Sequence, residues 1–420
     1  MNSISRRHFH SIASSVATGA VVSSTLRAAP SDRLAVGFIG VGTMGRGHLG
    51  SFLGMNDIEV VAVCDVVKER TDSAANTVAN HPNYKPAGKQ AQKFDDYRKL
   101  LDLKGLDAVV IATPDHWHAL QAVHAARAGK HIYCEKPLTR TIGEGRKVVE
   151  EVAKAGIVFQ TGSQQRSEFG GHFRNAVERV RNGLIGKLEV IRIGVGVPAI
   201  ACALPAQETP EGTDWERWVG PAAFRPYHSD LCPKGVHGHF PAWRSYREYA
   251  GGGLADMGAH HFDIAQWALD MDKSGPVKII PPKDPKATSG LRYVYASGLQ
   301  MIHGGEADCV FVGDKGTIRV SRSKIEADKP EILKEELAMG GFRVYPSNNH
   351  RRNWVESVRL KKECICPAET GHRSASICHL GNIGYRLSRE LTWDPARETF
   401  TGDEEAQTLV NPPLRAPFTW

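Results

Sequence analysis

The sequence lacks the features that mark several large classes of protein. It has no long run of one charge, because a net charge of +7 is spread over 420 residues. This dispersed excess predicts a mildly basic surface and argues against nucleic-acid binding. After residue 30 no apolar stretch is long enough to span a bilayer, and neither internal repeats nor low-complexity tracts occur. Length and composition predict an ordinary globular protein with two domains.

Cysteine is present, but its spacing indicates no metal site. Eight cysteines in a chain of this length do not form a disulfide framework by number alone. Cys364 and Cys366 are too close together for a typical zinc pair, and no second pair flanks them. We therefore expect no metal, and the disulfide state stays open.

The first thirty residues resemble a twin-arginine export signal. Arg6 and Arg7 precede Phe9, a weakly apolar segment covers residues 12–26, and Ala28 with Ala29 offers small residues for cleavage. The alternative is an irregular N-terminus with a chance arginine pair. The signal, residues 1–30, predicts an exported, periplasmic protein.

The following stretch has the pattern of a dinucleotide-binding site. A buried apolar strand over 34–39 leads into Gly40, Gly42 and Gly45, a G-x-G-x-x-G turn that contains Thr43 and Met44. Glycines there allow a tight turn, close approach of a pyrophosphate and close packing of the next helix. A second apolar run, 58–64, ends at Asp65, twenty residues after Gly45. A carboxylate at that position accepts ribose hydroxyls and repels a 2′-phosphate, so NAD is favoured over NADP.

Strand and helix patterns alternate at short spacing as far as residue 160. This alternation predicts a doubly wound parallel sheet over residues 31–160. Residues 161–390 are expected to form a second α/β domain on a large, mostly antiparallel open sheet. Such a sheet leaves one face for a partner, so a homo-oligomer, a dimer or a tetramer, is expected. Residues 391–420 are expected to form a C-terminal arm. Candidate strands of the second sheet are 187–197, 291–303, 306–312 and 316–320.

Two clusters have residues suited to proton chemistry. Glu135-Lys136-Pro137 follows a predicted parallel strand, at the edge where doubly wound sheets bind ligands. A lysine there can hydrogen-bond a substrate oxygen, although a solvated lysine at a strand end is the alternative. Asp256 and His260 are four residues apart, on one face if the segment is helical. The carboxylate would fix the imidazole as a general base, with Asp263 behind it; alternatively Asp256 caps a helix and His260 is core.

Taken together, these motifs resemble the Gfo/Idh/MocA oxidoreductase family. The shared features are the GVGTMG turn with Asp65, the Thr113-Pro114 turn, the EKP sequence and the DxxxHxxD pattern. The resemblance implies a Rossmann domain followed by an α/β domain, with Lys136, Asp256 and His260 as the catalytic trio. Cofactor contacts are expected at Gly40, Gly42, Thr43, Met44, Gly45, Asp65, Thr113, Pro114, His118, Glu135 and Lys136. Substrate contacts are expected at Lys136, Gln165, Arg166, Trp243, Arg244, Asp256 and His260.

The resemblance implies NAD-dependent oxidation of a sugar or polyol hydroxyl. His260 would take the hydroxyl proton, oriented by Asp256, while Lys136 holds the same oxygen. Two alternatives use the same residues with NAD kept bound: glycoside cleavage through transient oxidation, or oxidation of one sugar coupled to reduction of another. Export favours both, because free NAD is scarce outside the cytoplasm. A sugar or cofactor sensor that has lost catalysis is a further alternative, although the three catalytic residues are intact.

Overall fold

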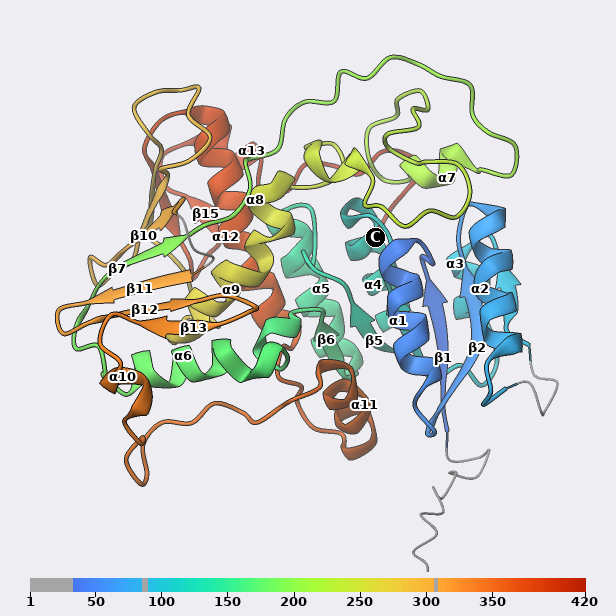
Figure 1. The fold of residues 1–420 in the computed structure, drawn as a ribbon. Helices are drawn as coiled ribbons and strands as arrows, with labels where there is room; N and C mark the ends of the chain where they lie inside the picture. The colour runs from blue at the N-terminus through green and yellow to red at the C-terminus, as the bar shows by residue number, and fades with distance from the viewer. Residues whose placement is uncertain (1–32, 85–89, 306–308) are drawn as a thin grey trace, which may run out of the picture.

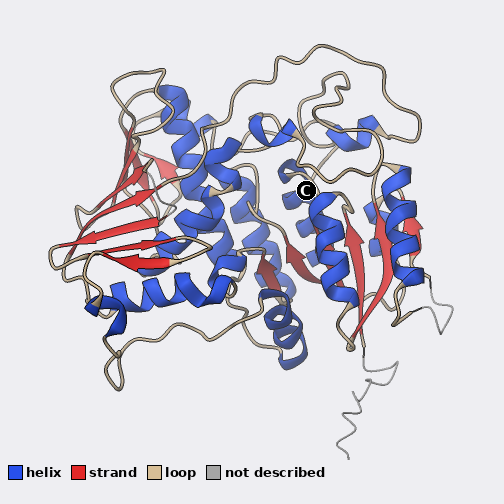
Figure 2. Cartoon of the chain, viewed as in Figure 1, coloured by secondary structure: helices blue, strands red, loops and turns tan. Residues whose placement is uncertain are grey.

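The computed structural model describes residues 33–84, 90–305 and 309–420. The predicted export signal lies outside these residues. Figure 2 shows the strands in two groups with helices between them, and Figure 1 shows which part of the chain forms each group. One group is a six-stranded sheet and the other a nine-stranded sheet. The predicted combination of a parallel N-terminal sheet with a mostly antiparallel C-terminal sheet is confirmed.

The six-stranded sheet has the order β3-β2-β1-β4-β5-β6, and all its pairs are parallel. Its apolar strands are covered on both faces, which is why they read as continuous hydrophobic runs. Helices α1, α2 and α11 pack on one face, and α3, α4 and α5 on the other. The strands are β1 (Leu34–Ile39), β2 (Ile58–Cys64), β3 (Gln92–Phe94), β4 (Ala108–Ile111), β5 (His131–Cys134) and β6 (Phe159–Thr161). The helices are α1 (Thr43–Leu53), α2 (Lys68–Asn80), α3 (Tyr97–Leu101), α4 (Asp115–Arg127), α5 (Ile142–Ala155) and α11 (His350–Leu360).

The nine-stranded sheet has the order β13-β12-β11-β7-β10-β9-β8-β14-β15. Its pairs are antiparallel except β7 with β10. The expected strand 291–303 is two strands, because Gly298 adopts a φ of +84° and turns the chain into a hairpin. The strands are β7 (Leu188–Ile193), β8 (Lys278–Ile280), β9 (Arg292–Val294), β10 (Gln300–His303), β11 (Cys309–Gly313), β12 (Thr317–Val320), β13 (Ile325–Ala327), β14 (Leu391–Asp394) and β15 (Thr399–Phe400).

Three helices pack on the side of this sheet that faces the parallel sheet (Figure 1). They are α6 (His172–Arg181), α9 (Gly258–Ala268) and α12 (Ala368–Leu387). Helix α12 also contacts α5 and β6, so it joins the two sheets. Short helices α8 (Gly252–Asp256), α10 (Glu331–Lys334) and α13 (Glu404–Thr408) lie in the connections.

The C-terminal segment differs from the expected arm. Residues 391–400 form β14 and β15 at the edge of the nine-stranded sheet, because the apolar side chains of Leu391, Trp393 and Phe400 are buried in its core. The last residues of the chain cross back to the first domain. There Phe418 packs its ring against Trp117 of α4, with the centroids 5.5 Å apart.

A long connection lies over the edge of the parallel sheet. We call residues 200–250 the roof segment; it contains α7 (Trp215–Val219) and the short helix η5 (Ala242–Ser245). Figure 1 shows it arching from β7 across the top of the molecule to α7, above α1 and β1. Its aromatic core includes Trp215, Trp218 and Tyr249, and Val67 of the first domain packs into that core. No sequence motif predicted a role for most of this segment.

Candidate active site

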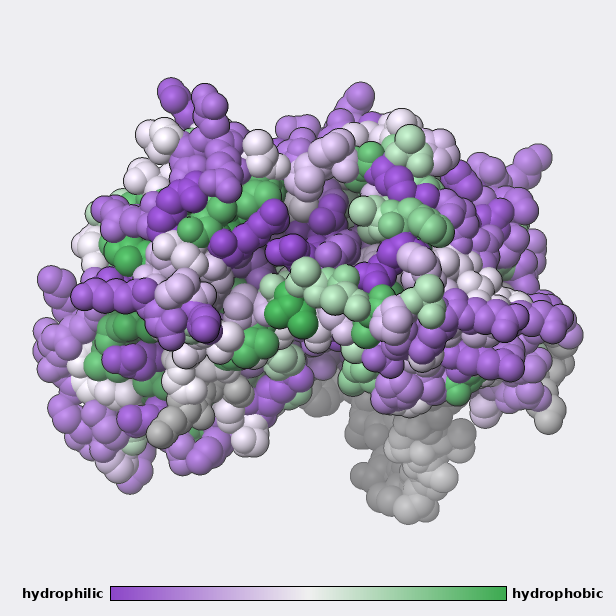
Figure 3. Space-filling view, turned by 90° about the horizontal axis from the view of Figure 1, so that it is seen from above, coloured by the Kyte–Doolittle hydropathy of each residue, from purple (hydrophilic) through white to green (hydrophobic). Residues whose placement is uncertain are grey.

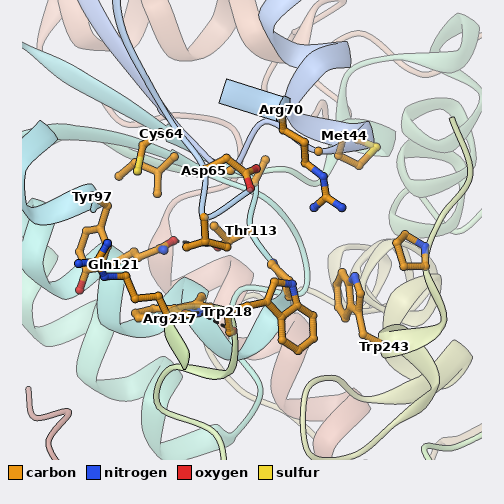
Figure 4. A pocket seen from close by; sticks show the side chains of 18 of the residues that line it. Met44, Cys64, Asp65, Arg70, Tyr97, Thr113, Gln121, Arg217, Trp218 and Trp243 are labelled. Atoms are coloured by element: carbon orange, nitrogen blue, oxygen red, sulfur yellow. Dashed lines mark hydrogen bonds between the residues drawn. The ribbon is translucent and has the colours of Figure 1, made fainter. Parts of the chain in front are cut away.

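A cavity lies between the parallel sheet and the roof segment. The first domain contributes Gly40, Gly42, Thr43, Met44, Asp65, Thr113 and Pro114 to its lining. The roof segment contributes Arg217, Trp218, Leu231, His237, Pro241, Trp243 and Arg244. Figure 4 shows Trp218 and Trp243 beside each other in this cavity, with Asp65 and Arg70 across from them. A concave lining of aromatic and apolar side chains with a few polar groups is typical of sites for small organic ligands.

The glycine turn is built as the motif predicts. Gly40 has a φ of +83°, and a Cβ there would lie 2.7 Å from the Thr113 nitrogen. A Cβ on Gly45 would overlap the Gly40 carbonyl oxygen, whereas one on Gly42 would meet no atom within 4 Å. Helix α1 has no side-chain cap at Gly42, so its first N–H groups remain available to an anion.

Asp65 lies at the end of β2 with both carboxylate oxygens anchored. It accepts hydrogen bonds from the backbone N–H groups of Val41 and Val67, each at 3.0 Å. Two arginines are close by, but both bind the roof segment. Arg70 donates to the carbonyls of Gly235 at 2.9 Å and Pro233 at 2.5 Å. Arg46 donates to the His237 carbonyl, and its buried Nη1 has no partner among the described residues. A buried cationic donor beside the glycine turn fits the phosphates of a dinucleotide.

The roof segment is hydrogen-bonded along the whole edge of the cavity. Backbone N–H groups of Lys68 and Asp214 donate across the gap to Gly212 and Val66, each at 2.9 Å. The His116 N–H donates to the Tyr249 carbonyl at 3.1 Å. In the sequence, the only signal for this cover is a concentration of tryptophan and tyrosine in a segment without strand or helix periodicity.

Lys136 and Asp256 come together beyond the cavity, at the end of β5. The Lys136 ammonium donates to the Oδ1 atom and to the backbone carbonyl of Asp256, both at 2.7 Å. Arg244, which lines the cavity, brings its Nε to 3.8 Å from the same carboxylate oxygen. Burial raises the pKa of Asp256, but Lys136 and Arg244 outweigh it and leave the pKa below its usual value. Asp256 is therefore an anion that holds two cations at the site.

The expected pairing of Asp256 with His260 is not what the structure has. Helix α8 ends at Asp256 and α9 begins at Gly258, and Met257 between them keeps right-handed helical dihedral angles. The spacing therefore does not decide the pairing: the Asp256 carboxylate binds Lys136 instead. Asp256 thus orients the Lys136 ammonium and not, as predicted, the His260 imidazole.

His260 is buried in α9, with 3% of its surface exposed. Burial lowers its pKa well below the usual value, and nearby Lys136 lowers it further. Its Nδ1 has no hydrogen-bond partner among the described residues. Gln165 donates to the His260 carbonyl at 3.3 Å and accepts from Arg322 at 3.0 Å. The His260 imidazole is therefore neutral, with Nδ1 unused. Gln165 contacts the backbone of His260 and not its ring.

Arg166 is a correction to the predicted substrate contacts. Its guanidinium is 1% exposed and forms a bidentate ion pair with Asp263 at 2.8 and 2.9 Å, and a second one with Asp272. Ser374 donates to Asp263 at 2.6 Å. Asp263 therefore binds Arg166 and Ser374 instead of His260, and four of the five N–H donors of Arg166 are used by carboxylates.

Glu135 and His118 support the site from behind. Neither is among the cavity's lining residues. Burial raises the pKa of Glu135, yet hydrogen bonds from His48 at 2.7 Å and Gln164 at 2.8 Å, with the charge of Lys136, lower it to about 2. The His118 ring lies 2.8 Å from both the Pro137 and the Thr113 carbonyl oxygens. These two residues hold the turns that position Lys136 and the cavity wall.

A second carboxyl group, which no sequence motif predicted, lies at the site. Asp115, the first residue of α4, is 5% exposed and has Lys136, Asp256 and Arg244 as charged neighbours. Burial raises its pKa well above the usual value, and the negative charge of Asp256 raises it further. The two aspartates thus have opposite pKa shifts. The only signal in the sequence is the position of Asp115 directly after the Thr113-Pro114 turn.

No group of three or more metal-ligating side chains is found among residues 33–84, 90–305 and 309–420. Within the same residues, no helix has the length and apolarity needed to cross a bilayer.

Comparisons with known proteins agree with this architecture. Residues 34–163 match the family model for the NAD-binding Rossmann fold of the Gfo/Idh/MocA oxidoreductase family, and residues 200–420 match the model for its C-terminal alpha/beta domain. The second match alone covers more than half of the chain.

Individual relatives match over shorter stretches. A glycosyl hydrolase family 109 protein of Shewanella pealeana is 32% identical over 37% of this chain and 34% of its own length. Myo-inositol 2-dehydrogenase of Thermotoga maritima is 30% identical over 39% of this chain and 46% of its own length. In these matches the chain spans from a third to a half of the relatives.

Among solved structures, the WlbA dehydrogenase of Bordetella pertussis, in complex with NADH and UDP-GlcNAcA, has a TM-score of 0.60 at 18% identity. That match covers 86% of this chain and 99% of the other. An aldose–aldose oxidoreductase of Caulobacter crescentus gives 0.58 at 16% identity, covering 86% and 99%. These likenesses show a common fold. Motifs, sheet topology and both family models agree: the chain belongs to the Gfo/Idh/MocA oxidoreductase family and carries its NAD-binding Rossmann fold.

Proposed function

We propose that the protein is an NAD-dependent oxidoreductase that acts on a hydroxyl group of a sugar or polyol. The observation that carries this proposal is the placement of Lys136, Asp256 and a neutral, buried His260 together beyond a cavity lined by the glycine turn. NAD fits this cavity: the turn leaves open space at Gly42, and Arg46 offers a buried donor without a partner in the described chain. When bound, the cofactor supplies the hydride acceptor.

The chain's own residues then divide the proton chemistry. Lys136, fixed by Asp256, donates a hydrogen bond to the substrate oxygen and stabilises negative charge on it. His260 accepts the hydroxyl proton, because its imidazole is neutral and one nitrogen is unused. Asp65 supports NAD over NADP, since Arg46 and Arg70 already bind the roof segment. The roof covers the cavity through backbone hydrogen bonds to the first domain and is expected to hold the cofactor firmly.

The roof also favours a second candidate function. With the cofactor held under hydrogen-bonded chain, release of NADH in each cycle would require the roof to open. A retained cofactor suits redox-neutral reactions, either glycoside cleavage through transient oxidation or oxidation of one sugar coupled to reduction of another. We also propose that the protein is exported to the periplasm by the twin-arginine route, because residues 1–30 resemble that signal. Export is consistent with a cofactor that is loaded once. A homo-oligomer is proposed separately, because the open sheet offers a face to a partner.

The first test determines what the purified protein holds. The protein is denatured and the supernatant is assayed for NAD(H) and NADP(H). Stoichiometric NAD(H) supports a resident cofactor and the redox-neutral alternative. If the purified protein contains no nicotinamide cofactor but forms NADH from added NAD and a sugar, the result supports a dehydrogenase that exchanges its cofactor in each cycle. Binding of NADP(H) alone contradicts the assignment of Asp65, and no nicotinamide binding at all contradicts the proposed function.

A further inference from the structure

Phe240 is an aromatic side chain at the mouth of the site that the proposed chemistry does not use. It lies in the roof segment with 57% of its surface exposed, although its backbone neighbours are held. Thr43 donates to the His239 carbonyl at 3.0 Å, and the Ala242 N–H donates to the Asp230 carbonyl at 2.9 Å. The backbone is therefore held on both sides of Phe240, while its ring is left uncovered.

Its contacts lead directly to the catalytic residues. The guanidinium of Arg244 lies 4.8 Å from the Phe240 ring centroid and 4.2 Å from that of Trp243. The Nε of Arg244 lies 3.8 Å from Asp256, which binds Lys136 at 2.7 Å. Trp243 is 6% exposed and lines the cofactor cavity. One guanidinium thus separates an exposed ring from the carboxylate that holds the catalytic lysine.

Phe240 and Arg244 have complementary chemistry for a sugar. An aromatic face packs against the C–H face of a pyranose ring, and a guanidinium donates to several hydroxyl groups. Within the described residues Arg244 makes one hydrogen bond, a long one of 3.4 Å to the Pro241 carbonyl, so most of its donors remain available. Figure 3 looks down on this side of the molecule and shows separate hydrophobic patches among hydrophilic residues, a mixed surface suited to a ligand with polar edges and apolar faces.

We propose that Phe240 forms the platform of a second sugar subsite, so that the substrate is a glycoside or oligosaccharide with a ring beyond the one that is oxidised. The inference rests on the proposed function, because it needs the reacting ring at Lys136 and His260. Arg244 then bridges the two rings: it orients Asp256 on one side and binds hydroxyls of the outer ring on the other. The platform contributes affinity for the outer ring and takes no part in proton transfer.

The test compares Phe240→Ala with a matched variant. Phe224→Ala is the control, because Phe224 also lies in the roof segment and is 56% exposed, but its ring faces Arg415 at 5.7 Å. The assay uses glucose, galactose, maltose, cellobiose, lactose and melibiose, and follows oxidation through the absorbance of reduced nicotinamide. For the disaccharides that react, Phe240→Ala should raise KM roughly five- to twentyfold with kcat unchanged. Glucose and galactose should change less than about twofold, Phe240→Trp should retain the affinity, and Phe224→Ala should behave as the wild type.

Binding measured by titration calorimetry separates this proposal from the proposed function. If disaccharides bind more weakly to Phe240→Ala but none is oxidised by the wild type, the subsite stands and the proposed reaction fails. Equal effects on monosaccharides and disaccharides, or no binding of any sugar of the panel, would overturn the subsite. A change of molar mass in Phe240→Ala, seen by light scattering, would also overturn it and assign the ring to a contact between protein copies.

Discussion

At the residue scale, the site depends on how one anion is shared between cations. The carboxylate of Asp256 binds the Lys136 ammonium at 2.7 Å, while Arg244 lies 3.8 Å away on the side of the cavity. This arrangement fixes the lysine without taking up all its donors, because an ammonium has three N–H bonds. It also leaves His260 free of a carboxylate partner among the described residues, which keeps the imidazole a weak but neutral base.

Replacement of Lys136 should therefore affect turnover far more than binding of the cofactor. In Lys136→Met we expect kcat for sugar oxidation to fall roughly 10²- to 10⁴-fold, because both the positive charge and the hydrogen bond to the reacting oxygen are lost. NAD(H) content, measured after denaturation, should stay the same. Lys324→Met is the control, since Lys324 forms a similar pair with Glu326 at 2.9 Å on the surface. Unchanged turnover in Lys136→Met would remove the lysine from the mechanism.

The lowered pKa of His260 predicts the acid limit of activity. Burial and Lys136 disfavour the charged imidazole, so the neutral, proton-accepting form persists to a lower pH than for a free histidine. The pH profile of kcat should stay flat through about pH 6.5, the ordinary value for histidine, and should fall only at more acidic pH. The measurement is a rate profile from about pH 4.5 to 9, with His81→Gln as a control outside the site. A fall in kcat that begins at or above the ordinary value would contradict His260 as the base.

The residues that a local motif predicts to lie together do so. Gly40, Gly42 and Asp65 line one cavity because turn, strand and helix adjoin each other in sequence, and their contact with a cofactor stays a prediction. Arg166 was misplaced because a buried arginine with an aspartate partner looks the same in sequence as one that faces a ligand. Asp115 was missed because its shifted pKa depends on Asp256, a residue far away in the chain.

At the element scale, the roof segment is what sequence patterns did not predict. Strands β1 and β2 and helices α4 and α5 were predicted because each has its own periodicity and end signals, such as the capping box of Thr141 and Glu144. The roof has no such period, since its order comes from stacked aromatic rings and from hydrogen bonds to a distant sheet edge. The roof covers the cavity at the glycine turn, and the proposal that it retains the cofactor there can be tested through its core.

Trp215 lies in that core without lining the cavity, so it tests the roof without altering a cavity-lining side chain. Its ring stacks on Trp218 with the centroids 4.6 Å apart, and its indole N–H donates to the Arg225 carbonyl at 2.8 Å. Trp215→Leu should loosen the roof, so the purified protein should contain less NAD(H), and added NAD should exchange faster in a dialysis assay. Trp393→Leu, a buried tryptophan of β14, is the matched control and should keep its cofactor. Equal NAD(H) content in the two variants would show that the roof does not retain the cofactor.

At the scale of the whole molecule, the two sheets are joined through α12. Arg146 of α5 binds Glu369 of α12 at 2.8 Å and Glu398, beside β15, at 2.9 Å. Close packing supports these ion pairs. Gly371 of α12 lies so near β6 that a Cβ would overlap the Thr161 hydroxyl. The site needs this junction, because Lys136 comes from the first domain and His260 from the second.

A methyl group at the junction should therefore destabilise the whole molecule. In Gly371→Ala the new Cβ must displace Thr161, and we expect a loss of roughly 1–3 kcal/mol of stability, as for overpacked cores. The control is Gly50→Ala in α1, where a Cβ meets no atom within 4 Å and the gain in helix propensity is about 0.5–1 kcal/mol. Calorimetry should show a single transition for both variants, lower than the wild type for Gly371→Ala and equal or higher for Gly50→Ala. If Gly371→Ala instead splits the transition in two, the domains unfold independently, and α12 connects them without coupling their stability.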